Sequence, residues 1–273
     1  MSEIVLSSAV RSNLLQLQQT SDLITQTQNE LATGKKINSA LDGAINFFTA
    51  QGLDTRTNTL NSLLDSMSNG INIIQAANNG ITSITKLVQS AQALVSQAQQ
   101  ANNTTTQATL STQFNALLTQ IGQLAIDSGF NGVNLLADNT LTVTMDETGA
   151  ASVSVTGVNY TNANNAPLSI ANATNNWAAA SDITAASTAL SAALTALQGK
   201  SQTLSSSLST VQIRQDFTKS MVNTLQTGSD DLTLADSNEE GANLLALQTR
   251  QQRSSTALSL AAQSDQNVLR LFR

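Results

Sequence analysis

The chain has 273 residues, enough for one large or two small domains, and it contains neither histidine nor cysteine. It therefore has no thiol nucleophile, no Ser-His catalytic pair and no disulfide, and it lacks the usual transition-metal ligands. Its net charge is −6, and no Lys or Arg occurs between Lys86 and Lys200. This distribution excludes the basic face that a nucleic-acid partner requires. No apolar run approaches the roughly 20 residues of a membrane span, so we expect no membrane insertion.

A weak heptad pattern predicts a long first helix from Leu6 to Leu31. The positions that recur at steps of three and four are Leu6, Val10, Asn13, Leu17, Thr20, Ile24, Thr27 and Leu31. Polar residues occupy several sites of this seam, so the helix is too weakly apolar to be stable alone and needs a partner. Gly34 is predicted to end it.

Residues 35–58 break the pattern, with glycine at 43 and 52, and are predicted to form a connector. Helical spacing resumes from Leu60 and ends at residues 102–104. Gly70 and Gly80 weaken this second helix, because glycine costs up to about 1 kcal/mol relative to alanine. Residues 104–107 (TTTQ) match a capping box and predict a third helix that continues to Leu124.

The middle of the chain changes to a period of two. Apolar residues alternate with Thr or Ser over 141–145 and 151–155, with turn residues at 146–149, which predicts a β-hairpin. Residues 157–180 are rich in Asn and Ala and contain Pro167, so they are predicted to be irregular. Trp177 in this segment is expected to pack locally rather than to mark a binding surface.

Helical spacing returns over 183–225, with an interruption predicted at Gly228 and Asp230-Asp231. A second capping box at 237–240 (SNEE) opens a last helix. Its seam runs through Leu244, Leu247, Gln251, Ser254, Leu258, Ala261, Asp265, Val268 and Phe272. We therefore predict a mainly α fold of long antiparallel helices, in which the N- and C-terminal segments pair as a coiled coil beside a small β-hairpin region.

Three pairs of adjacent acids are the candidate catalytic groups: Asp146-Glu147, Asp230-Asp231 and Glu239-Glu240. They fall at a turn, a helix break and a helix start, where acidic residues are expected for local structural reasons. No phosphate-binding glycine loop and no metal-spaced cluster occurs in the sequence. We expect no catalytic, cofactor or metal site, and no enzyme.

Polar residues in the two terminal seams favour a helical assembly over an ordinary soluble bundle. They would weaken a closed core, whereas between copies they can set register and partner choice. The residues predicted to pack between subunits are Leu6, Val10, Leu14, Leu17, Ile24, Leu31, Leu244, Leu247, Leu258, Val268, Leu269 and Phe272.

Several stretches resemble bacterial flagellin: SAVRSNLLQL at 8–17, LATGKKINSA at 31–40, GFNGVNLL at 129–136, and most of 242–272. The resemblance implies a short flagellin, without large outer domains, that polymerises into the flagellar filament and serves motility as a helical propeller. It further implies an inner coiled-coil domain from 1–44 and 236–273. A helical second layer would comprise 45–139 and 182–235, and a hairpin with a variable surface segment would comprise 140–181.

The resemblance also implies partners and location. The partners would be further copies or sister flagellins, the type III export apparatus with a chaperone, and the cap and hook-junction proteins. Because Glu3 stands where a signal peptide carries bases, we expect export to the extracellular flagellum without a cleaved leader. Residues 41–45 (LDGAI) depart from the paired aspartates of many flagellins. A hook–filament junction protein and a secreted helical translocator or scaffold are the alternatives.

Overall fold

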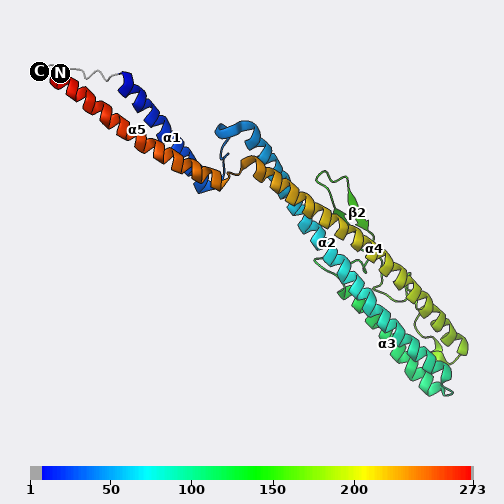
Figure 1. Ribbon diagram of the computed structural model, residues 1–273. Coiled ribbons are helices and arrows are strands. Elements are labelled where there is room, and N and C mark those ends of the chain that lie inside the picture. The colour runs from blue at the N-terminus through cyan, green and yellow to red at the C-terminus, as the bar shows by residue number, and fades with distance from the viewer. Residues whose placement is uncertain (1–7, 272–273) are drawn as a thin grey trace. The chain divides into compact units, whose positions relative to one another are not determined.

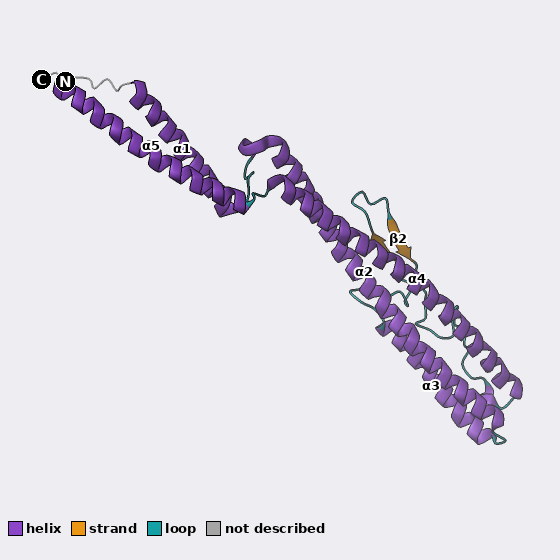
Figure 2. Ribbon diagram, viewed as in Figure 1, coloured by secondary structure: helices purple, strands orange, loops and turns teal. Residues whose placement is uncertain are grey.

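The computed structural model describes residues 8–271, apart from the side chains at 9, 265 and 268–271. The helices are α1 (Ser8–Thr33), α2 (Ala40–Gln100), α3 (Thr104–Asp127), α4 (Ala180–Thr233) and α5 (Ser237–Leu271) (Figure 1). The strands β1 (Leu141–Thr144) and β2 (Ser152–Val155) and the short turn η1 (Asn175–Trp177) lie between α3 and α4 (Figure 2). The predicted mainly α fold with one hairpin is confirmed.

The chain forms two compact units. The terminal unit comprises residues up to Arg56 together with those from Thr224 onward, and the middle unit comprises Thr57–Asn223. Helices α2 and α4 contribute residues to both units.

In the terminal unit, α1 packs against α5 along the predicted seam. Val10, Thr20, Ile24 and Thr27 are buried, while the α5 seam positions from Leu244 to Ala261 are half-buried. The Thr20 hydroxyl donates to the Gln16 carbonyl oxygen at 2.8 Å, so a polar seam residue is satisfied within its own helix. The spacing of three and four therefore identified the faces by which these helices meet.

The connector predicted over 35–58 is wrong beyond residue 39, because α2 already begins at Ala40. The sequence SALD at 39–42 forms a capping box that the composition of the segment obscured. The Asp42 carboxylate accepts from the backbone N–H of Ser39 at 2.8 Å, and the Ser39 hydroxyl accepts from the N–H of Leu41 at 3.3 Å. Gly43 departs from helical geometry (φ 174°, ψ 88°), but the helix resumes directly behind it.

Before this helix, Gly34 ends α1 with φ +65°, as predicted. The backbone N–H groups of Lys36 and Ile37 then donate to the Thr233 carbonyl oxygen, at 2.8 and 3.2 Å. In return, Ala235 donates its N–H to the Gly34 carbonyl oxygen at 3.0 Å. These bonds tie the turn after α1 to the end of α4 within the terminal unit.

The two predicted capping boxes were each placed one residue too late. Asn103, rather than Thr104, caps α3 by accepting from the Thr105 N–H at 2.8 Å. Asp236, rather than Ser237, accepts from the Asn238 N–H at 2.9 Å at the start of α5. Asn and Asp are at least as good as Ser or Thr at this position.

The interruption predicted at 228–231 is also wrong, because α4 continues to Thr233. The side chains at Leu225, Ser229 and Thr233 are buried along one face of this part of α4. Gly228 faces Leu53, whose Cδ1 would lie 3.5 Å from a Cβ at this position. Tertiary packing of this face offsets the intrinsic helix cost of glycine.

The core of the middle unit lies between the apolar faces of α2, α3 and α4, with Ile74, Ile84, Phe114 and Leu190 fully buried. The hairpin strands pair antiparallel as predicted, with Leu141 opposite Val155.

Gly70 marks the point where this hairpin approaches α2. A Cβ on Gly70 would come within 2.6 Å of Val143 Cγ2. Gly70 lowers the intrinsic helix propensity of α2, but its missing side chain leaves the space that Val143 occupies.

The GFNGVNLL stretch forms a tight turn that inserts leucines into this core. Asn131 (φ 49°) and Gly132 (φ 79°) occupy the turn, and Phe130 and Val133 exchange two backbone hydrogen bonds, at 2.9 and 3.0 Å. Leu135 and Leu136, which follow, are fully buried.

Trp177 packs in the interior and does not mark a binding surface, as predicted, but it joins the main core rather than only its own segment. Its side chain is fully buried, and its ring centroid lies 4.9 Å from that of Phe114 on α3. The segment 157–180 is irregular apart from η1, so this prediction is confirmed as well.

Candidate subunit interface

One acid of each adjacent pair accepts hydrogen bonds from residues close to it in the chain. Asp146 accepts from the Thr148 hydroxyl and from the Ala151 N–H in the hairpin turn, and these bonds lower the pKa of its carboxyl. A general acid at neutral pH requires the opposite shift. The Asp230 carboxylate accepts from Gln226 at 3.2 Å, and the buried Glu240 carboxylate accepts from Asn243 at 3.4 Å.

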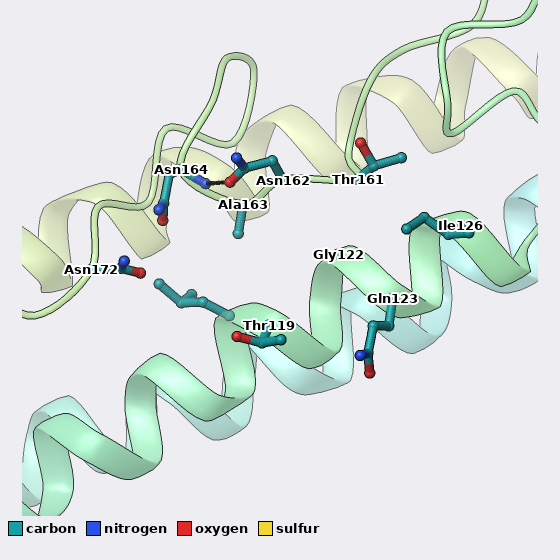
Figure 3. A pocket seen from close by; sticks show the side chains of 10 residues that line it. Thr119, Gly122, Gln123, Ile126, Thr161, Asn162, Ala163, Asn164 and Asn172 are labelled. Atoms are coloured by element: carbon teal, nitrogen blue, oxygen red, sulfur yellow. Dashed lines mark hydrogen bonds between the residues drawn. The ribbon is translucent and has the colours of Figure 1, made fainter.

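One cavity of the middle unit is lined entirely by side chains that do not ionise, whereas acidic side chains line two cavities of the terminal unit together with Lys36. A cavity of about 280 Å³ lies between α3 and the segment around residues 161–172 (Figure 3). Its walls carry amides, hydroxyls and apolar groups, including Gln123, Ile126 and Asn172, and no ionisable side chain. Among the residues that the structure describes, no group of acids is placed to hold a metal ion. None of the described helices is long and apolar enough to cross a bilayer.

In addition to Asp146, the residues Tyr160 and Lys200 of the middle unit have shifted pKa values, and burial explains both of these shifts. Burial raises the pKa of Tyr160 to about 12, so its hydroxyl stays protonated at neutral pH. Burial lowers the pKa of Lys200, whose ammonium donates to the Thr156 carbonyl oxygen just after β2. Lys200 thus joins the base of the hairpin to α4.

The residues predicted to pack between subunits divide into three groups. Most of those that can be assessed lie in the contact between α1 and α5 of the same chain. Buried or half-buried in this way are Val10, Leu17, Ile24, Leu31, Leu244, Leu247 and Leu258. Leu14 instead faces outward and is 45% exposed. Leu6 and Phe272 lie outside the described residues, and the side chains of Val268 and Leu269 are not described.

Exposed leucines on the outward faces of α1 and α5 were missed by the seam pattern. Besides Leu14, they are Leu15, Leu23, Leu245 and Leu260. The sequence alone could have indicated a second contact face. A helix with one partner needs only one apolar stripe, and these leucines lie outside that stripe. The terminal unit therefore has an internal seam and, on both helices, a second set of apolar side chains in contact with solvent.

Comparison with known proteins decides the family. A family model described as the bacterial flagellin N-terminal helical region matches residues 4–140. Flagellin FljM of Caulobacter vibrioides is 30% identical over 266 residues, covering 95% of this chain and 94% of that protein. The chain belongs to the bacterial flagellin family. A flagellin of Brucella melitensis matches this flagellin over 100% of both chains at 27% identity.

Membership of the family fixes the general role of this flagellin. It is a structural subunit that polymerises with further copies into the flagellar filament and so serves motility. The matches run over nearly the full chain and do not favour the hook-junction or scaffold alternatives.

Proposed function

We propose that this flagellin polymerises through the outward faces of α1 and α5, which pack against the terminal units of neighbouring copies. The observation that carries the proposal is the set of solvent-exposed leucines on these faces, Leu14, Leu15, Leu23, Leu245 and Leu260. Burying one such side chain is worth about 1.5–3 kcal/mol, so their burial in a filament would add substantial stability. The predicted subunit-packing residues at Leu6, Val268, Leu269 and Phe272 would extend the same faces.

The internal seam has a different role in this proposal. It pairs α1 with α5 along one narrow line that includes Thr20, Thr27 and Gln251. Ordering the backbone costs about 1–2 kcal/mol per residue, which a single polar seam offsets poorly. The two helices would therefore be loosely ordered in the free chain and become fixed when further copies cover their outer faces.

The proposal also covers the layers that the chain would form in the filament and the route by which it would leave the cell. Residues 1–44 and 236–273 would form the inner coiled coil, residues 45–139 and 182–235 would form the next helical layer, and residues 140–181 would provide the hairpin and a surface segment. The chain would be exported by the type III apparatus with a chaperone and would join the filament outside the cell beside cap and hook-junction proteins. It would have no catalytic activity, which is consistent with the local roles of its paired acids.

Deletion of residues 259–273 tests this mechanism. The shortened chain keeps the whole middle unit and should remain soluble and largely helical by circular dichroism, yet form no filaments under electron microscopy. In the full-length chain, Leu260→Ser should weaken assembly. The exposed Ser255→Ala, which lies about 140° around the same helix from Leu260, should leave it unchanged and serves as the control. Filaments of ordinary length from the deletion variant would contradict the mechanism.

A further inference from the structure

An exposed apolar stripe marks the start of α2 in the terminal unit. Leu41 and Ile45 are 97% and 83% exposed, the highest values among the large apolar side chains that the structure describes, and Phe48 is 61% exposed. Phe48 has one aromatic neighbour, Phe47, whose ring centroid lies 5.5 Å away in an edge-on arrangement. We call Leu41, Ile45 and Phe48 the α2 stripe.

Ile45 and Phe48 of the α2 stripe lie on the side of the helix opposite to its internal packing face, and Leu41 precedes them across the non-helical Gly43. Ala50 is buried and accepts a long hydrogen bond (3.5 Å) from the Ser229 hydroxyl, so this face packs within the terminal unit. At 3.6 residues per turn, Ile45 and Phe48 lie about half a turn around the helix from Ala50. A helix that is apolar on two opposite faces is normally covered on both.

The backbone at the start of the α2 stripe is fixed by hydrogen bonds. The capping box of Ser39 and Asp42 fixes the first turn of α2, and the backbone N–H groups of Lys36 and Ile37 anchor the preceding turn to Thr233. A preformed surface loses little conformational entropy when a partner covers it.

The surroundings of the stripe select the partner. Its flanks carry Asp42, Asn46 and Thr49, and residues 37–55 contain no Lys or Arg. Lys36, just before them, lines a cavity together with three acids, Glu30, Asp42 and Asp231, so acidic groups outnumber it there. This composition does not suit anionic lipid or nucleic acid, both of which require cations. The chain polymerises with itself, so a further copy is the partner present at high local concentration.

We propose that the α2 stripe is a second self-association surface, which binds a further copy of this flagellin at a surface unlike itself. Packing of one stripe on another would produce a closed two-fold dimer, whereas filament growth requires unlike surfaces to meet. The inference rests on the proposed assembly of copies through their terminal units. It adds a contact made by α2, whereas the terminal seams identify residues on α1 and α5 only.

Cysteine labelling provides the direct test, because the chain has no cysteine of its own. Ile45→Cys should react rapidly with a maleimide in the free chain and at least about tenfold more slowly in filaments. Asn46→Cys is the matched control, since it is exposed on the neighbouring flank of the same turn. An equal labelling rate of Ile45→Cys in both states, or protection no greater than at Asn46→Cys, would overturn the proposal.

Assembly thermodynamics gives the second readout. Ile45→Ser and Phe48→Ser should each raise the critical concentration for filament growth by about tenfold or more, whereas Ile45→Val should change it little. Neither serine variant should alter the thermal unfolding of the free chain, because these side chains are already exposed there. Serine variants with the parent critical concentration would refute the stripe alone. Assembly of the 259–273 deletion would instead refute the proposed role of the terminal helices.

Discussion

Gly122 of α3 lies directly against the carbonyl oxygen of Thr161: a Cβ atom on Gly122 would come within 2.3 Å of that oxygen. Figure 3 shows the two residues on facing walls of the same cavity. Real Cβ atoms essentially never approach a backbone oxygen so closely. The glycine therefore sets how closely the irregular segment 157–180 can approach α3.

Gly122→Ala should destabilise the middle unit by about 1–3 kcal/mol, although alanine is the better helix former, because the backbone at 161 must move. Gly199→Ala is the matched control, since nothing lies within 4 Å of a Cβ there. It should stabilise the protein by about 0.5–1 kcal/mol. Urea unfolding of the unpolymerised chain measures both changes, and equal effects of the two substitutions would contradict this reading of Gly122.

Trp177 is fully buried, and its indole N–H has no hydrogen-bond partner. Trp177→Ala should cost about 3–5 kcal/mol, because it removes a large core side chain that packs on Phe114. Trp177→Phe should cost much less, because it keeps most of the ring contact and removes a buried unsatisfied donor, itself worth about 1–3 kcal/mol. Thermal unfolding followed by circular dichroism distinguishes the two, and equal losses would show that ring packing is not what Trp177 contributes.

The cap of α3 can be located by two single substitutions. Asn103→Ala should lower stability by about 1 kcal/mol, because it leaves the Thr105 N–H without its acceptor. Thr104→Ala, one residue later, should have an effect below about 0.5 kcal/mol. Urea unfolding of both variants checks this, and a larger loss at Thr104 would restore the capping box that the sequence predicted.

Acid should weaken the start of α2. Hydrogen bonds from the backbone N–H groups of Ser39 and Asn38, and from the Ser39 hydroxyl, hold the pKa of Asp42 below its ordinary value of 3.8. A carboxyl whose pKa is lower in the folded state stabilises the fold above pH 3.8, and this contribution is lost as the pH falls through the folded-state pKa. Asp42→Asn should therefore be less stable than the parent at pH 7 and equal to it at strongly acidic pH. A stability difference independent of pH would contradict this role.

Periodicity identified the hairpin, the faces by which α1 and α5 meet and most of each helix, because each depends on side chains that repeat along one element, but it missed the start of α2 and the end of α4. The Thr20 and Thr27 positions were correctly placed in the seam, although neither is apolar. Trp177 was correctly expected to be a packed side chain, although its partner Phe114 lies far along the chain.

Some features could not be predicted from the sequence. They depend on contacts between segments that are distant in the chain, or on a difference of one residue at a helix end. Gly70 and Gly122 appeared only as weak points or as neutral positions, because their close neighbours, Val143 and Thr161, lie far along the chain. The continuation of α4 through Gly228 likewise depends on tertiary packing. Leu14 was among the residues predicted to pack between subunits, but the other outward leucines and the α2 stripe were missed, because a search for one apolar seam does not test the remaining faces of a helix.

Hydrogen–deuterium exchange of the free chain and of filaments tests the central claim most directly. The account predicts that amides of α1 and α5 exchange quickly in the free chain and become strongly protected in filaments, while those of the buried core of the middle unit are protected in both states. Protection of α1 and α5 in the free chain equal to that of the middle unit would contradict it, because the terminal helices would then already be fixed before any further copy covers them.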